Sequence, residues 1–145
     1  MKKVRAHVFV LFAALLFLTS QTGAAEKIAT DSSERETVIV YYFHGTNRCP
    51  SCTKIENWSY EAIKDSFPKA LNEDRLLWKP VNVDKPENRH FIKEYSLSTK
   101  SLIITEVKGD KQTKWKNLDK VWRLLRDQEK FFAYVTQEVR NYMDN

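Results

Sequence analysis

The chain has 145 residues, of which 42% are hydrophobic and 30% are charged, and its formal net charge at pH 7 is +5. Setting aside three basic residues in an N-terminal leader leaves 21 Lys and Arg against 19 Asp and Glu, a net charge of +2. This composition fits one compact domain. It argues against a nucleic-acid-binding protein, because no basic block with interleaved aromatic residues is present.

The first 25 residues have the three parts of a secretory signal peptide. Three basic residues stand within the first five positions, residues 8–18 form an apolar run of 11, and small residues precede a cleavage point after Ala25. A membrane-spanning helix needs roughly 20 such residues. We therefore expect a cleaved signal, a periplasmic or extracytoplasmic location and no stable membrane span after cleavage. An uncleaved anchor is the alternative.

After the signal, residues 26–36 are polar and unpatterned, which predicts a flexible lead-in to one domain over residues 37–145. Residues 37–43 are β-branched and aromatic without alternation, as in a strand covered on both faces. A loop follows over residues 44–48. The next residues predict a helix from Cys49 to about Ser66, with Pro50 in its first turn. Its apolar positions recur at helical spacing: Cys52, Ile55, Ala62 and Ile63.

The second half continues the alternation of strands and helices. Residues 76–83 predict a strand in which Pro80 is unfavourable. Pro86 begins a helix with Phe91, Ile92 and Tyr95 on one face. Residues 102–107 and 112–116 predict a hairpin around a turn at Gly109.

Two helices are predicted after this hairpin. The first is short and capped by Asn117, and the second begins after Asp127. The spacing of apolar residues in this second helix predicts four buried residues: Phe132, Val135, Val139 and Tyr142. The complete order, β-α-β-α-β-β-α, predicts an α/β domain with a central mixed sheet flanked by helices.

The only two cysteines, Cys49 and Cys52, stand where the first strand gives way to the first helix. Two thiols three residues apart at the first turn of a helix can close and reopen a disulfide. An exported chain also meets oxidants that form such bonds. An inert disulfide is the alternative, which we disfavour because so short a ring gains little loop entropy.

This order of elements around a C-x-x-C motif resembles thioredoxin-like domains over roughly residues 37–140. A narrower resemblance links the chain to the small exported proteins labelled the ArsF-type family of nitrophenyl compound nitroreductase subunits. It is carried by the segments YYFHGTNRCPSC, NVDKPENRHFIKEY and KWKNLDKVW. We expect no flavin or nicotinamide cofactor, because the chain has three glycines and no Gly-rich dinucleotide loop.

Two positions depart from the usual thioredoxin pattern. Ser101 stands where a cis-proline normally faces the cysteine pair, and residues 40–43, ending in Phe43, lack the acidic residue often buried behind it. The thioredoxin-like fold is still expected. These two departures argue against efficient general dithiol reduction and favour a specialised thiol chemistry.

The resemblance implies a different role for each cysteine. Cys49 would be the nucleophile, because unpaired N–H groups and the helix dipole at a helix N-terminus stabilise a thiolate. Cys52, one turn further in, would resolve the mixed disulfide.

Five residues are expected to shape this site: Pro50, Ser51, His44, Arg48 and Ser101. Pro50 fixes the turn between the cysteines, and positive charge on Arg48 and His44 would lower the pKa of the Cys49 thiol. Each assignment has a structural alternative. Arg48 would then be a solvated loop charge, His44 a hydrogen-bonding partner of the loop backbone, and Ser101 a turn residue.

The predicted function is thiol–disulfide exchange or electron transfer, that is, a candidate thiol–disulfide oxidoreductase. Its partner would be a protein or small-molecule thiol or disulfide, with a membrane-bound reductase among the candidates. Two alternatives stay open. Cys49 and Cys52 would suit a thiophilic ion such as Cu(I) or arsenite, whereas structural zinc needs four ligands. The domain could also be a non-catalytic interaction subunit.

Overall fold

The computed structural model describes residues 36–144. The predicted signal peptide and residues 26–35 of the predicted lead-in lie outside this range. Glu36, which the sequence placed in the lead-in, is instead the first residue of strand β1 (Glu36–His44), where it pairs with Lys108. Residue 37 was therefore one position too late as the beginning of the domain's first strand.

The described residues form one mixed four-stranded sheet with the order β2-β1-β3-β4. The remaining strands are β2 (Leu76–Asn82), β3 (Ser101–Lys108) and β4 (Lys111–Asn117). β1 runs parallel to β2 and antiparallel to β3, and β3 and β4 form an antiparallel hairpin. β1 is thus a central strand, which agrees with its predicted burial on both faces.

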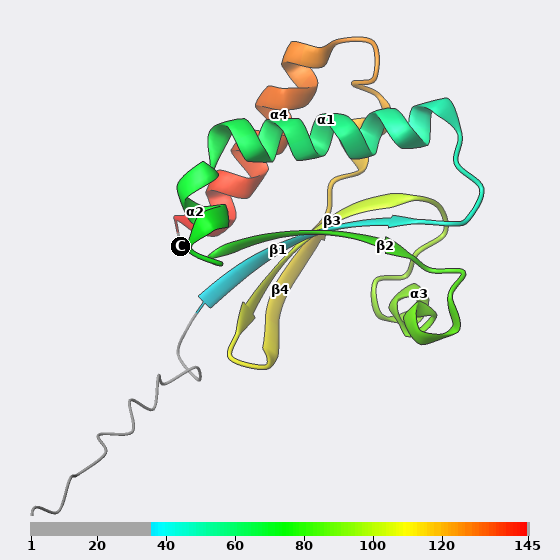
Figure 1. The fold of residues 1–145 in the computed structure, drawn as a ribbon, viewed down its shortest axis with the longest axis horizontal. Coiled ribbons are helices and arrows are strands. Elements are labelled where there is room, and N and C mark those ends of the chain that lie inside the picture. The colour runs from blue at the N-terminus through cyan, green and yellow to red at the C-terminus, as the bar shows by residue number, and fades with distance from the viewer. Residues whose placement is uncertain (1–35, 145) are drawn as a thin grey trace, which may run out of the picture. The chain divides into compact units, whose positions relative to one another are not determined.

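Helices cover both faces of this sheet (Figure 1). On one face lie α1 (Pro50–Ser66) and α4 (Gln128–Met143), and on the other lies the short α3 (His90–Glu94). Helix α2 (Pro68–Asn72) follows α1, and two 3-10 turns, η1 (Pro86–Asn88) and η2 (Asp119–Trp122), precede α3 and α4.

The larger core lies between the sheet and the α1–α4 layer. All four apolar positions predicted for α1 are buried, so the helical spacing was read correctly. Alternate residues of β1, namely Val38, Val40 and Tyr42, face this core. On the same side, Lys116 of β4 forms an ion pair with the carboxylate of Glu138 on α4, at 2.8 Å.

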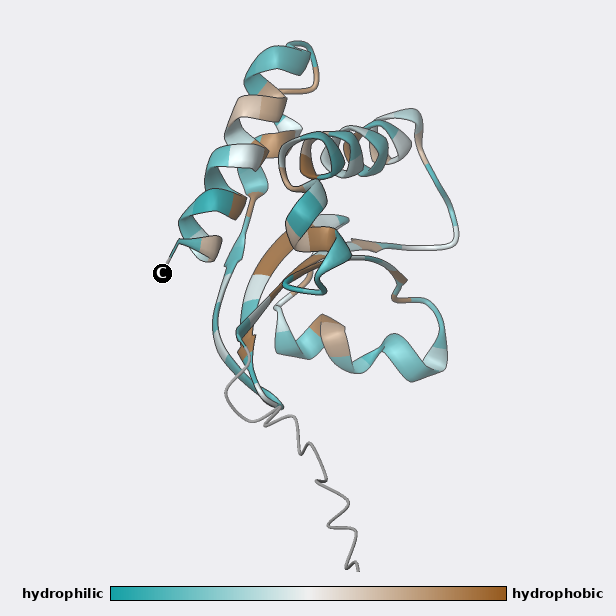
Figure 2. Cartoon of the chain, turned by 60° about the vertical axis from the view of Figure 1, so that its left-hand side comes forward, coloured by the Kyte–Doolittle hydropathy of each residue, from teal (hydrophilic) through white to brown (hydrophobic). Residues whose placement is uncertain are grey.

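The smaller core lies on the opposite face, where Phe43, Tyr95 and Ile103 are buried beneath α3. The aromatic rings of Phe43 and Tyr95 are 5.3 Å apart between centroids. Figure 2 shows hydrophobic residues concentrated along the strands, with hydrophilic residues prominent on the helices. Both faces of β1 are therefore covered, one by the long helices α1 and α4 and the other by the short helix α3.

Several details of the predicted elements were wrong. The chain from Pro86 forms a 3-10 turn followed by a five-residue helix, and not one continuous helix. Of the three residues predicted to share a face, Tyr95 is buried, Phe91 is partly buried and Ile92 is 41% exposed. Asn117 ends β4 and does not cap the next turn, whose N-cap is Leu118. In α4, Phe131 is fully buried, whereas Phe132 and Tyr142 are only partly buried.

Pro80 proves compatible with its strand because β2 lies at the edge of the sheet. An edge strand has one side without a neighbour, so the missing proline N–H removes no bond from the ladder there. Helix α2 was not predicted; it is five residues long and begins at Pro68.

The observed element order and the strand order β2-β1-β3-β4 are those of a thioredoxin-like α/β domain, which confirms the predicted fold class. In the part of the chain that the structure describes, no helix has the length and apolar character needed to cross a membrane.

Candidate redox site

The cysteine pair is positioned by the central strand of the sheet. β1 ends at His44, and a short loop carries the chain from the end of β1 to the beginning of α1 at Pro50 (Figure 1). Cys49 is the N-cap of α1, with the extended backbone usual for this position (φ −93°, ψ 158°). The strand-to-helix junction inferred from the sequence is therefore where the thiols lie.

Cys49 and Cys52 are joined in a disulfide, with their Cα atoms 5.0 Å apart. The two residues differ sharply in accessibility, because Cys49 is exposed whereas Cys52 is only 1% exposed. The backbone N–H of Cys52 also donates a hydrogen bond to Cys49 Sγ, at 3.1 Å. The outer sulfur can meet a partner, and an N–H group of the first helical turn already points at it.

Pro50 and Ser51 occupy the first turn between the cysteines, and both are exposed. Pro50 is the first helical residue, where a missing N–H costs nothing because that group has no partner within the helix. Arg48, in the loop that precedes Cys49, is also exposed. The residues on both sides of Cys49 in the chain are therefore accessible to solvent.

Arg48 forms an ion pair with Glu56, which lies further along α1. Its guanidinium carbon is also 5.9 Å from the centre of the Tyr42 ring. The positive charge predicted to act on Cys49 is therefore balanced in part by a carboxylate. Glu56 was missed at the sequence level, although a residue seven positions after Cys49 lies two helical turns along and within reach of a long side chain.

His44 hydrogen-bonds with its own loop. Its Nδ1 lies 2.9 Å from the carbonyl oxygen of Gly45, a contact that requires a proton on Nδ1. The Arg48 guanidinium, 3.5 Å from the same nitrogen, cannot then donate to it. The geometry matches the structural alternative for His44, and its predicted effect on the thiol stays a prediction.

Ser101 is the first residue of β3 and pairs with Phe43 in the sheet register, at the end of β1 from which the cysteine loop departs. It is 4% exposed, and its hydroxyl donates to the carbonyl oxygen of Thr99 at 3.0 Å. Among residues 36–144 no hydrogen bond joins Ser101 to either cysteine. Its predicted place opposite the thiols therefore rests on sheet register alone.

Tyr42 is a site residue that the sequence analysis did not identify. Its buried hydroxyl donates to the carbonyl oxygen of Cys52 at 2.7 Å, which ties the first turn of α1 to the central strand. Burial raises the pKa of Tyr42, opposed by the nearby Arg48 charge. Strand alternation was the missed signal, because Tyr42 faces α1 while Phe43 faces the smaller core.

The cysteine loop is anchored on its other side by Asp84, whose carboxylate accepts a hydrogen bond from the backbone N–H of Thr46 at 2.7 Å. That bond, reinforced by Lys100 and Arg89, lowers the pKa of Asp84. Gly45 allows a close approach of the loop here, because a Cβ at this position would lie 3.0 Å from Asp84 Oδ2, a tight contact that the carboxylate would have to relieve by shifting.

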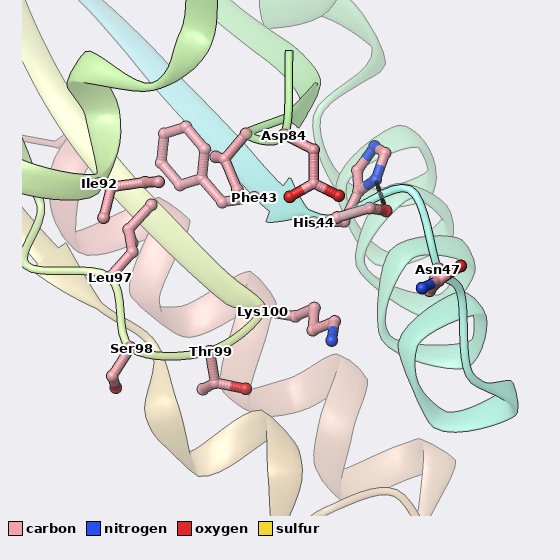
Figure 3. A pocket seen from close by; sticks show the side chains of 11 residues that line it. Phe43, His44, Asn47, Asp84, Ile92, Leu97, Ser98, Thr99 and Lys100 are labelled. Carbon is pink, nitrogen blue, oxygen red and sulfur yellow. Dashed lines mark hydrogen bonds between the residues drawn. The ribbon is translucent and has the colours of Figure 1, made fainter. Parts of the chain in front are cut away.

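Next to this anchor lies a cavity of about 270 Å³ (Figure 3). Phe43, Ile92 and Leu97 form its apolar end, and Asp84 and Lys100 lie nearer the loop that carries Asn47. The anchoring carboxylate is thus part of a mixed apolar and polar wall beneath the cysteine loop.

Within residues 36–144, no three or more His, Cys, Asp or Glu side chains gather as metal ligands would. The two-thiolate site considered for a soft ion consists of Cys49 and Cys52 alone, which are joined to each other here.

The strand order and a C-x-x-C disulfide at the N-terminus of α1 define a thioredoxin-like domain. No protein-family model matches the chain, and no curated protein matches it. Among solved structures, thioredoxin O2 from Arabidopsis thaliana in its oxidised state is 20% identical, with 70% of this chain and 78% of that chain covered and a TM-score of 0.41.

Two other thioredoxins align at similar levels. Fasciola hepatica thioredoxin is 17% identical over 72% of this chain and 86% of that chain, with a TM-score of 0.40. Thioredoxin from Trypanosoma brucei brucei is also 17% identical, over 76% and 86%, with a TM-score of 0.39. The class assignment depends on the topology and the disulfide described above.

Proposed function

We propose that the chain performs thiol–disulfide exchange through Cys49 and Cys52. One observation carries the proposal: a disulfide at the beginning of α1 has one exposed and one buried cysteine. A partner sulfur can approach Cys49, whereas Cys52 is shielded by the core. This asymmetry separates a nucleophile from a resolving thiol, a distinction that a purely structural disulfide does not need.

The exchange would begin from the oxidised pair. A partner thiolate attacks Cys49 Sγ, the Cys49–Cys52 bond breaks, and Cys52 leaves as a thiolate that takes up a proton. A second partner thiolate then attacks the partner sulfur of the mixed disulfide and releases Cys49. The partner departs as a disulfide, and the domain holds the two electrons as a dithiol. The reverse sequence would reduce a partner disulfide.

The first turn of α1 would stabilise the Cys49 thiolate released in this sequence. The Cys52 N–H already points at Cys49 Sγ, and the helix dipole adds positive potential at this end. Thiols in such positions have pKa values below the roughly 8.5 of a free cysteine. A lower thiol pKa favours the reduced pair and makes the disulfide a better oxidant.

We further propose, from the sequence, that this domain acts outside the cytosol after removal of a signal peptide. We also propose that the chain is related to the ArsF-type family and that its redox partner is a membrane-bound reductase. In the reverse sequence, in which the domain reduces a partner disulfide, the oxidised pair needs a source of electrons to become a dithiol again, and a membrane-bound reductase would supply them.

The direct test combines redox titration with trapping. Equilibration in a series of glutathione buffers should interconvert the disulfide and the dithiol reversibly. Alkylation of the free thiols and the resulting increase in mass would measure the fraction of reduced protein in each buffer. Cys52→Ser should accumulate a mixed disulfide through Cys49, whereas Cys49→Ser should trap nothing. A pair that neither titrates nor traps would contradict the proposal.

A parallel measurement addresses the metal-binding alternative. The reduced protein is offered Cu(I), zinc or arsenite, and native mass spectrometry records the bound species. Under the exchange proposal, any such binding should be displaced by partner disulfides. Stoichiometric binding in a protein that does not exchange would favour the ion-binding module instead.

A further inference from the structure

Two open hollows flank the first turns of α1, beside the exposed Cys49. One lies along α1 between Pro50 and Trp58 and has a volume of about 640 Å³. The other extends from Ser51 towards Trp122 and Arg126 and has a volume of about 540 Å³. Ser51 and Lys54 line both hollows, which we name together the Ser51 groove.

The charge of the Ser51 groove has one sign. Lys54, Arg123 and Arg126 line it, and no Asp or Glu does. Among the described residues none of these three cations has an ion-pair partner. Lys54 donates instead to the carbonyl oxygen of Leu125 at 3.0 Å. The seven ion pairs between basic and acidic side chains of residues 36–144 all lie outside the groove.

Two tryptophans accompany the cations. Lys54 Nζ lies 4.4 Å from the centre of the Trp58 ring, which holds the lysine against the helix. Trp122 is partly buried, and its Nε1–H donates to the carbonyl oxygen of Lys100 at 3.2 Å. Both indole rings are thereby fixed beside the cations, and the groove offers flat apolar surface as well as positive charge.

From these observations we propose that the Ser51 groove binds an acidic polypeptide segment of the thiol or disulfide partner, and so selects the substrate. This inference rests on the proposed exchange function. A segment is favoured over a small anion because the groove consists of two shallow hollows that meet at Ser51, a shape that suits an extended chain. Its unpaired cations would attract Asp and Glu side chains and steer the reactive sulfur towards Cys49.

The test compares two dithiol peptides with the same cysteine spacing, one flanked by Glu and the other by Lys. Stopped-flow kinetics would follow reduction of the wild-type disulfide. The Glu peptide should react about tenfold faster at low ionic strength. That advantage should largely disappear in about 0.5 M salt, because screening shortens the range of the charges.

The Arg123→Glu/Arg126→Glu double variant should reverse the preference between the peptides. The Lys79→Glu/Lys111→Glu variant makes the same change in net charge at β2 and β4, and it should keep the wild-type preference. Reaction with the small reductant dithiothreitol should be unchanged in both variants, which would show that the disulfide itself keeps its reactivity, and circular dichroism would show that each variant is folded.

The outcomes separate this inference from the function on which it rests. Equal rates for the two peptides, with normal exchange by dithiothreitol, would overturn the acidic-segment proposal and leave thiol exchange standing. Loss of preference in both double variants would also overturn it, because net charge alone would then explain the rates. If neither the peptides nor dithiothreitol reduced the Cys49–Cys52 disulfide, both proposals would be overturned.

Discussion

At the scale of single residues, the two neighbours Tyr42 and Phe43 perform different tasks because a strand turns successive side chains to opposite faces. Tyr42 reaches the backbone of Cys52, and Phe43 packs in the smaller core. The position behind the cysteines is therefore held by a neutral, hydrogen-bonding ring in place of a carboxylate. Its hydroxyl holds the first turn of α1 without placing a carboxylate there.

Replacing Tyr42 by Phe should lower the free energy of unfolding by about 1 kcal/mol, the usual net value of one such hydrogen bond. Chemical denaturation of the oxidised protein measures this loss. Tyr41→Phe is the matched control, since the Tyr41 hydroxyl makes no hydrogen bond within residues 36–144, and it should cost less. Equal losses in the two variants would show that the bond to Cys52 contributes nothing.

A second prediction concerns the Arg48–Glu56 ion pair and the reactivity of Cys49. In the reduced Cys52→Ser protein, Glu56→Gln should lower the pKa of the Cys49 thiol, because the Arg48 charge is then unbalanced. Alkylation by iodoacetamide near pH 7 should become about two to three times faster.

Glu61→Gln is the control for this change, as an exposed carboxylate on the same helix. It should leave the pH profile of alkylation close to that of the parent. If Glu56→Gln also leaves the profile unchanged, the Arg48 charge has no influence on the thiol.

At the scale of elements, α4 shows how far a helical pattern determines a buried face. The predicted buried residues begin at Phe132 and the observed ones at Phe131, and both sets include Val135 and Val139. Phe131 and Phe132 lie four and three residues before Val135, and both separations place a side chain on the same helix face as Val135. Packing against α1 and the sheet turns the helix so that Phe131 is fully buried, with its ring 5.4 Å from that of Trp58 between centroids.

Phe131→Ala should therefore destabilise the domain by about 3–5 kcal/mol, as expected for a large side chain removed from a core. Phe132→Ala, at a partly buried position, should cost about half as much or less. Urea denaturation compares the two. A larger cost for Phe132→Ala would mean that the helix is rotated relative to the packing described here.

At the scale of the whole molecule, stability should depend on pH through several carboxylates with lowered pKa values. Hydrogen bonds from Thr46 lower the pKa of Asp84, and hydrogen bonds from Lys114 and Thr113 lower that of Glu106. A depressed pKa stabilises the fold above the unfolded-state pKa, and that contribution disappears as the pH falls through the folded-state pKa.

The free energy of unfolding should thus decline as the pH falls below about 4. Asp84→Asn should make this decline shallower, and added salt should weaken the effect of Lys100 and Arg89 on Asp84. Asp65→Asn, at an exposed carboxylate near the end of α1, should preserve the parent slope. Identical slopes in all three proteins, measured by urea titration at several pH values, would contradict a role for Asp84.

The sequence by itself determined the order of the four strands and of the helices α1, α3 and α4, the position of Cys49 and Cys52 at a strand-to-helix junction, and the burial of Ile55 and Ile63. These features depend on local periodicity and on neighbours along the chain. The tertiary structure decided which cysteine is accessible, the bond from Tyr42 to Cys52, the pairing of Arg48 with Glu56, and the Asp84 anchor. The anchor joins residues 38 positions apart, and the accessibility of each cysteine follows from the packing of α1 on the sheet; local periodicity carries no information about either.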